Sequence, residues 1–227
     1  MLNDCRACPR LARFLDETKA EYPDYFCKPV PPFGDAHPTL LIVGLAPGMH
    51  GANRSGRPFT GDHAGILLYQ TLHEFGYASR PQSLSADDGL ALKDCRITNA
   101  VKCLPPGNKP EGAEIRQCNA YLKAELQSLT GHAAILALGN VAHAAVLMAL
   151  GLKPKDHAFG HGAKHILPSP PERGRGVGVR GLELGRGEKK FRLYDSYHCS
   201  RYNTQTKRLT TDMFRAVFSR IKQDMEE

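Results

Sequence analysis

Short apolar runs alternate with longer amphipathic stretches along this chain. Four such runs occupy residues 39–43, 95–101, 133–138 and 191–197. Runs of this length that end in turn residues, with branched or aromatic side chains, are typical of β-strands. The pattern therefore predicts four strands, of which 39–43 leads into a loop rich in glycine and proline.

Between these runs the apolar residues follow a helical period. In the stretch 111–130 they recur every three or four residues and lie on one helix face: Ile115, Cys118, Leu122, Leu126 and Leu129. Similar patterns predict helices over 63–75, 140–150 and 211–225. Strands that alternate with helices form a parallel sheet covered on both faces. The sequence therefore predicts an α/β fold, a three-layer α/β/α sandwich around a mostly parallel four-stranded sheet, in one domain spanning 1–227.

The stretch 169–190 breaks this alternation. It is rich in glycine, proline and arginine, and it has too few apolar residues to build a core of its own. We interpret it as a surface insertion before the fourth strand. A solubilising loop is favoured over a phosphate-contacting one.

Composition and charge narrow the class of protein. The 227 residues are 41% hydrophobic and 23% charged, as in globular proteins, and no apolar run is long enough to span a membrane. The first ten residues, MLNDCRACPR, lack the apolar stretch of a signal peptide, so a cytoplasmic protein is expected. The 30 basic and 23 acidic residues give a net charge of +7, which favours a polyanionic partner without separating DNA from RNA.

The seven cysteines are many for a reducing compartment, where disulfides rarely persist. Cys5 and Cys8 form a C-x2-C pair that can chelate one metal centre, and Cys103 and Cys118 complete a four-cysteine site only if the fold brings them there. The alternative is that Cys118 is a core residue and Cys103 a loop thiol. These residues by themselves leave zinc and an iron–sulfur cluster both open.

The loop after the first predicted strand, residues 44–62, reads GLAPGMHGANRSGRPFTGD. Gly51 and Gly56 have the separation of a phosphate-binding loop. Arg57 and Pro58, however, stand where such a loop needs Lys and then Ser or Thr. Nucleoside triphosphate binding is therefore disfavoured.

Three segments together resemble one known family. They read GLAPGMHGANRSGRPFTGD, RITNAVKCLPP and YHCSRYNTQTKRLT, and with the N-terminal C-x2-C pair they resemble the iron–sulfur uracil-DNA glycosylases over nearly the whole chain. The first segment is similar to the type 5 branch in particular, because Leu45 and Ala46 follow its first glycine. The type 4 branch, the nearest alternative, carries Glu at the position of Leu45.

The resemblance implies a base-excision repair enzyme that hydrolyses the N-glycosidic bond of uracil in DNA and leaves an abasic site. By similarity, Phe59 would stack on the flipped base, Asn99 would bond its Watson–Crick edge, and Gly44 and Ala46 would complete the base pocket. His198 would contact the base and stabilise the negative charge that develops on it as the bond breaks.

The resemblance also assigns a role in water positioning. Ala46 stands where other branches carry a polar residue that positions the attacking water, so Asp62 becomes the candidate catalytic carboxylate. From the sequence alone, the alternative for Asp62 is the N-cap of the helix predicted over 63–75. The smaller side chain at Ala46 further implies tolerance of hypoxanthine, xanthine or modified uracils.

The expected partner is DNA that contains uracil or another deaminated base. The segment 200–206 would enter the minor groove, and three side chains are candidate contacts to the DNA backbone: Ser200, Arg201 and Lys207. A monomer is expected, because an enzyme that scans DNA needs no second copy.

The family further implies a 4Fe–4S cluster held by four cysteines: Cys5, Cys8, Cys103 and Cys118. Hydrolysis needs no electron, so the cluster would fasten the N-terminal segment to the loops that face DNA. A second metal site is disfavoured, although His157, His161 and His165 recur every four residues, because Gly160 and Gly162 interrupt any helix there.

Two other functions remain as alternatives to the glycosylase. One is a non-catalytic iron–sulfur protein that binds nucleic acid, and the other is a zinc-stabilised DNA-binding module. Detection of abasic sites in an oligonucleotide that contains uracil separates the first from an enzyme. A brown colour of the purified protein, which indicates iron and sulfide and not zinc, excludes the zinc-stabilised module.

Overall fold

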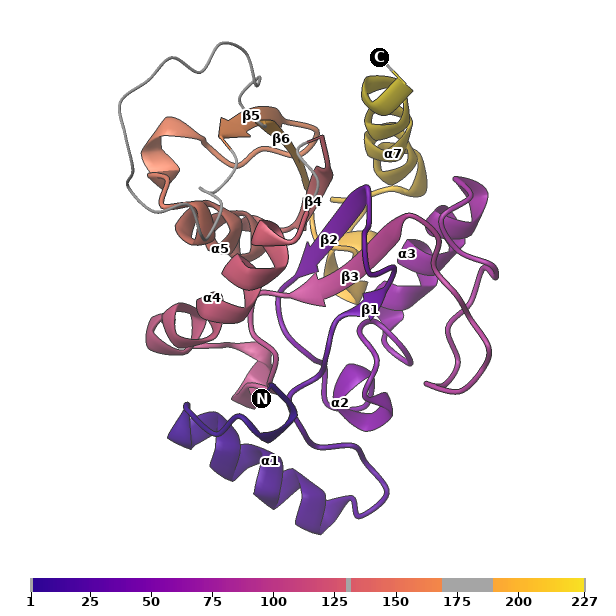
Figure 1. Ribbon diagram of the computed structural model, residues 1–227. Coiled ribbons are helices and arrows are strands. Elements are labelled where there is room, and N and C mark those ends of the chain that lie inside the picture. The colour runs from indigo at the N-terminus through magenta and orange to yellow at the C-terminus, as the bar shows by residue number, and fades with distance from the viewer. Residues whose placement is uncertain (1, 130–131, 169–189, 227) are drawn as a thin grey trace.

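The computed structural model describes residues 2–129, 132–168 and 190–226, which form one central sheet between two layers of helices (Figure 1). In this part of the chain the sheet has six strands in the order β1-β3-β2-β4-β6-β5. Their bounds are Phe33–Gly34 (β1), Leu40–Gly44 (β2), Cys95–Asn99 (β3), Ala134–Leu138 (β4), Lys164–Pro168 (β5) and Lys190–Ser196 (β6).

The four strands predicted from the sequence are the inner ones, and they run parallel in the order β3-β2-β4-β6. The predicted count of four is wrong, because β1 and β5 add an antiparallel strand at each edge. The β1 strand has only two residues, and β5 buries only Leu167. Edge strands with so little apolar burial leave no alternating pattern in the sequence.

Seven α-helices are present in the described residues: α1 (Pro9–Glu21), α2 (Ala52–Ser55), α3 (His63–Glu74), α4 (Gly112–Gln127), α5 (Asn140–Leu150), α6 (Arg201–Gln205) and α7 (Thr211–Glu226). Short 3-10 turns occupy Leu2–Asp4, Pro106–Asn108 and Pro154–Asp156. None of the helices described is long and apolar enough to cross a membrane.

The two faces of the sheet carry separate apolar cores, as the predicted sandwich requires. Alternate residues of β2 point to opposite faces. Leu40 and Ile42 pack with α3 and α7, whereas Leu41 and Val43 pack with α4 and α5. Figure 1 shows α4 and α5 on one side of the sheet and α3 and α7 on the other. The three-layer α/β/α prediction is confirmed.

Helix α1 lies outside the sandwich, next to α4 (Figure 1). Its Leu11 packs against Val101 and Cys118, so the N-terminal segment covers the loop that follows β3. The Arg10 guanidinium also forms an ion pair with Glu114 of α4, at 2.7 Å. Apolar contacts and this partly buried pair therefore place α1 against the loops at one edge of the sheet.

The predicted insertion over 169–190 lies outside the described residues except for Lys190, which begins β6. Its interpretation as a surface loop stays a prediction.

Candidate functional site

A cavity of about 510 Å³ lies where β2, β3 and β6 end, between the loops that leave these strands and the start of α6. Ligands of open α/β sheets bind at this carboxyl edge. Seven of the predicted site residues line the cavity: Ala46, Phe59, Asp62, Asn99, His198, Ser200 and Arg201. The fold thus brings together side chains that lie as far apart in the sequence as residues 46 and 201.

Gly44 shapes this cavity without lining it. It pairs with Asn99 in the parallel register of β2 and β3. A Cβ atom added at Gly44 would lie 2.4 Å from Asn99 Oδ1 and 2.6 Å from Phe59 Cζ. Any larger residue would therefore push the amide and the aromatic ring out of their positions, so glycine at this position is what lets the two side chains converge.

The amide of Asn99 is buried, with 3% of the residue exposed, and its Oδ1 has no hydrogen-bond partner among the described residues. A buried acceptor left without a donor costs about 1–3 kcal/mol. Because Asn99 also lines the cavity, a ligand N–H that reaches this oxygen would remove that cost. The side chain is therefore prepared for a hydrogen-bonding ligand.

A buried lysine holds the backbone of Asn99. Lys102 is 1% exposed, and its Nζ donates to the Asn99 carbonyl at 2.9 Å and to Glu125 Oε1 at 2.7 Å. The ammonium also bonds to the hydroxyl of Thr98. The backbone N–H of Lys102 donates to Cys118 Sγ at 3.3 Å. Lys102 thus links the strand end that carries Asn99 to the cysteine region.

Phe59 is held in a strained backbone conformation beside the cavity. Its φ is +58°, a value that costs a residue other than glycine roughly 1–3 kcal/mol. Its carbonyl lies only 1.9 Å from where a Cβ of Gly65 would be, so α3 can approach only with glycine at that position. The Phe59 ring stacks with His198, with centroids 6.0 Å apart and an angle of 26° between the planes. The two rings line the same cavity.

His198 follows β6, and its carbonyl accepts a hydrogen bond from Asn203 Nδ2 at 2.8 Å. Burial lowers the pKa of its imidazole to about 4. The ring is therefore neutral at pH 7, with one N–H donor and one acceptor nitrogen. A neutral imidazole can donate a hydrogen bond to an oxygen that gains negative charge.

Asp62 occupies the N-cap position of α3, but within the described chain its carboxylate makes no cap hydrogen bond to that helix. It accepts instead from the backbone N–H of Ala52, at 3.2 Å. A Cβ at Gly51 would lie 1.9 Å from Asp62 Oδ1, so the loop is built around this carboxylate. Burial raises the pKa of Asp62 against the opposing effect of the Ala52 bond. The side chain therefore faces the cavity and not the helix end.

The segment after His198 forms the rim of the cavity. Ser200 caps α6, where its Oγ accepts from the N–H of Asn203 at 3.4 Å. Arg201 is exposed on the rim, whereas Lys207 is exposed outside the cavity. Tyr202 also lines the cavity and is 69% exposed. These side chains give the mouth of the cavity a basic and aromatic surface.

Several lining residues were not singled out in the sequence. Asn108 and Tyr202 lie in segments that carried the resemblance or followed it, so their neighbourhood was a usable signal. His63 joins the two sides of the mouth, because its Nε2 lies 3.2 Å from Thr204 Oγ1 of α6. No local pattern predicts such a contact, since 141 residues separate its partners.

The four cysteines of the predicted metal site line one small cavity of about 20 Å³, together with Leu11 and Tyr121. Burial and the neighbouring thiols Cys118, Cys5 and Cys8 raise the pKa of Cys103 to about 12. Four thiolates can therefore share this space only if a cation neutralises them. Four thiols around one cavity are the donor type of a thiolate-bound metal centre, but in the described chain no three of their sulfurs lie within 4.8 Å of one another.

The other three cysteines lie elsewhere. Cys95 and Cys199 are completely buried in the core between the sheet, α3 and α7. Cys27 accepts a hydrogen bond from Asn53 Nδ2 at 3.4 Å. Among the described residues no disulfide joins any of the seven cysteines.

Comparison with known proteins identifies the family. The model of the uracil DNA glycosylase superfamily matches residues 31–222 of this chain. A type-5 uracil-DNA glycosylase of Thermus thermophilus is 42% identical over 97% of this chain and 94% of its own length. Another, from Pyrobaculum aerophilum, is 37% identical over 98% of this chain and 90% of its own length. The chain therefore belongs to the uracil DNA glycosylase superfamily.

The branch follows from how much of each relative is matched. A type-4 uracil-DNA glycosylase of Archaeoglobus fulgidus is 33% identical over only 61% of this chain and 56% of its own length. The type-5 relatives match nearly end to end. The type-5 branch is thus the one to which this chain belongs, as the sequence predicted.

Proposed function

We propose that this protein hydrolyses the N-glycosidic bond of uracil in DNA, the first step of base-excision repair, and leaves an abasic site. The observation that carries the proposal is the buried Asn99 amide, whose Oδ1 has no partner in the described chain, at a cavity that Phe59 and His198 also line. An aromatic face, an amide and a neutral imidazole around one cavity suit a flipped base.

Recognition of the base rests on two side chains. Phe59 stacks on the ring of the base, and Asn99 accepts from its N3–H while its Nδ2 donates to the adjacent carbonyl. An amide suits uracil because it offers one acceptor and donors on the same group. The hydrogen bond from Lys102 Nζ to the backbone carbonyl of Asn99 holds the strand end and so fixes the position of the side-chain amide in the cavity.

His198 supports bond breaking. As the bond between C1′ and the base nitrogen breaks, its electron pair moves onto the base, and the neutral imidazole donates a hydrogen bond to the base oxygen that gains charge. Donation to a developing oxyanion stabilises the transition state more than the ground state. The lowered pKa of His198 keeps the imidazole neutral at pH 7, so the ring donates its hydrogen bond as an uncharged group.

Asp62 orients the water whose oxygen forms the new bond to C1′. Its carboxylate lines the cavity, and burial raises its pKa, which makes it a better proton acceptor than an exposed aspartate. Ala46, also in the lining, offers no polar group for this task. The room beside its methyl group extends the substrate range to hypoxanthine and xanthine.

DNA reaches the site along the basic rim. Arg201 at the mouth and Lys207 beyond it are exposed and contact phosphates, while Ser200 supports the start of α6 that enters the minor groove. The chain's net charge of +7 adds affinity that is independent of sequence. The protein acts as a monomer in the cytoplasm.

A 4Fe–4S cluster held by four cysteines is part of this proposal: Cys5, Cys8, Cys103 and Cys118. When bound, it supplies cross-linking of the N-terminal segment to the loop after β3. The convergence of these thiols on one cavity and the Lys102 N–H bond to Cys118 Sγ support this ligand set over separate core thiols. The chain's own ion pair between Arg10 and Glu114 aids the same attachment.

The test is excision from duplex oligonucleotides that carry one uracil, hypoxanthine or xanthine opposite different bases, followed by alkaline cleavage of abasic sites. We expect cleavage at uracil by the iron-containing protein. His198→Ala should lower turnover far more than DNA affinity, and His37→Ala, an exposed histidine outside the cavity, is the matched control. Tight binding without cleavage would support the non-catalytic alternative and overturn the proposal.

A further inference from the structure

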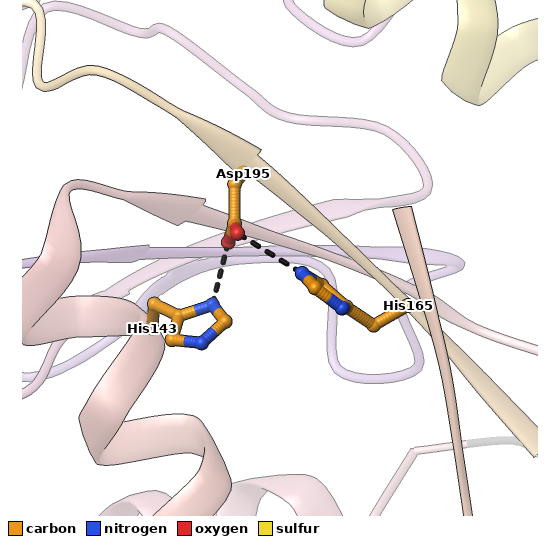
Figure 2. A group of neighbouring side chains, drawn as sticks. All are labelled: His143, His165 and Asp195. Atoms are coloured by element: carbon orange, nitrogen blue, oxygen red, sulfur yellow. Dashed lines mark hydrogen bonds and ion pairs between the residues drawn. The ribbon is translucent and has the colours of Figure 1, made fainter. Parts of the chain in front are cut away.

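Three metal-ligating side chains converge away from the cavity and the cysteines. His143 comes from α5, His165 from β5 and Asp195 from β6, and one donor atom of each lies within 4.8 Å of the others. His143 Nδ1 is 2.7 Å from Asp195 Oδ1, and His165 Nε2 is 3.2 Å from Asp195 Oδ2. Figure 2 shows both imidazole rings turned toward the Asp195 carboxylate.

The group is built into the protein interior. Asp195 is 0% exposed, His143 is 1% exposed, and the His165 side chain is 13% exposed. A buried carboxylate must be paired with a cation or with several donors. Within the described residues His165 is the most exposed member of the group, so an ion could enter from that side.

The second nitrogen of His143 fixes the state of its ring. Nε2 lies 2.8 Å from the carbonyl oxygen of His157, which can only accept, so Nε2 carries a hydrogen. A histidine that binds metal through one nitrogen commonly donates its other N–H to a carbonyl or carboxylate. This contact therefore leaves the electron pair of Nδ1 free for a metal ion that lies beside Asp195 and His165. Without a metal, a proton on Nδ1 makes the observed hydrogen bond instead.

We propose that His143 Nδ1, His165 Nε2 and an Asp195 oxygen bind one divalent transition-metal ion of the zinc class. Two imidazoles and one carboxylate suit zinc, whereas calcium and magnesium prefer oxygen donors. Ligands about 2.0–2.1 Å from a tetrahedral ion lie roughly 3.3 Å apart. The three donor atoms already lie within 4.8 Å of one another, so small side-chain movements bring them to that spacing. Water or His157, whose ring centroid is 5.8 Å from that of His165, completes the shell.

This ligand set differs from the one that the sequence spacing brings to mind. His157, His161 and His165 do not share a helix in the described chain, because only the turn Pro154–Asp156 and the strand β5 are regular there. His165 meets His143 and Asp195 through the pairing of β5 with β6 and the packing of α5. The site therefore depends on tertiary structure and not on the four-residue repeat.

The proposed ion would stiffen the strand that leads to the candidate catalytic histidine. Asp195 precedes His198 by three residues in the chain. Between them, the N–H of Tyr197 donates to His161 Nδ1 at 3.2 Å, and the two rings stack with centroids 5.0 Å apart. An ion that joins α5, β5 and β6 would thus fix the start of this segment. Its binding stands independently of the proposed glycosylase activity.

The experiment measures metal content of the full-length, iron-containing protein. Wild type, His165→Ala and the exposed control His37→Ala are dialysed with zinc at pH 7.5, freed of unbound metal, and analysed for zinc and iron. We expect one zinc per chain in wild type and in the control, no zinc in His165→Ala, and equal iron in all three. Equal zinc in His165→Ala and wild type, or no zinc in wild type, would overturn the proposal.

Two further readouts exclude zinc that has entered the cysteine site. X-ray absorption at the zinc edge should show nitrogen and oxygen neighbours; sulfur neighbours would count against the proposal. Zinc at 100 times its dissociation constant should raise the melting temperature of wild type by about 5–10 °C. The melting temperature of His165→Ala should not respond, and an equal rise in that variant would contradict the assignment.

Discussion

The buried pair of Lys102 and Glu125 provides a sharp test of how Asn99, the proposed base-binding residue, is held. The two side chains are 1% and 11% exposed, and Lys102 also bonds to the Asn99 carbonyl. Lys102→Met would leave the Glu125 carboxylate buried without its cation. Breaking a buried pair by removing one partner costs about 3–5 kcal/mol. The melting temperature should therefore fall by about 6–20 °C.

A double variant separates stability from positioning. Replacing both members of a buried pair by neutral groups is often nearly neutral for stability, so Lys102→Met with Glu125→Gln should recover most of the lost melting temperature. Asn99 still lacks its charged donor in the double variant. Loss of one such hydrogen bond, about 1.5–3 kcal/mol, corresponds to a fall of roughly 10- to 100-fold in the excision rate.

The assays are thermal unfolding and single-turnover excision of uracil. Lys123→Met is the matched control, because Lys123 is an exposed lysine of the same helix that carries Glu125. Equal stability of Lys102→Met and this control would contradict the stabilising role of the pair. A double variant that regains its full excision rate together with its stability would show that Lys102 has no effect on Asn99.

Three further predictions concern the site itself. Gly44→Ala should fold but lose at least 100-fold in excision, because its Cβ would lie 2.4 Å from Asn99 Oδ1; an unchanged single-turnover rate would contradict the packing argument. The folded-state pKa of His198, about 4, is below its unfolded value near 6.5. The free energy of unfolding of wild type should therefore decrease as the pH falls from about 6.5 to 4. His198→Gln should lose less of this free energy in urea titrations over the same pH range. Cys103→Ala should lose iron and folded protein together, and iron retained at wild-type content would refute the ligand assignment.

The sequence predicts the inner strands of the sheet because their burial requires continuous runs of apolar residues. All five residues of β2 and of β4 are buried, so both strands read as apolar runs closed by glycine. The edge strand β5 buries one residue of five and ends in proline, so it gives no such signal. A strand of this sheet can thus be predicted from the sequence when both of its faces are buried.

The site is less predictable, because its geometry depends on contacts between distant residues. Lysine is usually a surface residue. Lys102 is nevertheless buried, because its ammonium pairs with the carboxylate of Glu125, 23 residues later in the chain. The positive φ of Phe59 and the close approach of Asp62 to Gly51 likewise arise from packing. The resemblance supplied candidate residues, whereas local patterns alone favoured an N-cap for Asp62. The structure places Asp62 at the N-cap position of α3, but its carboxylate bonds to the Ala52 N–H and not to that helix.

The most direct measurement of the central claim is the release of free base. The protein is mixed in excess with a duplex that carries a single uracil, and free uracil and abasic sites are counted over time in the same samples. We expect one uracil per abasic site for wild type and a much slower release for Asn99→Ala. DNA that is fully bound, with no free uracil from wild type, would contradict uracil excision by this protein.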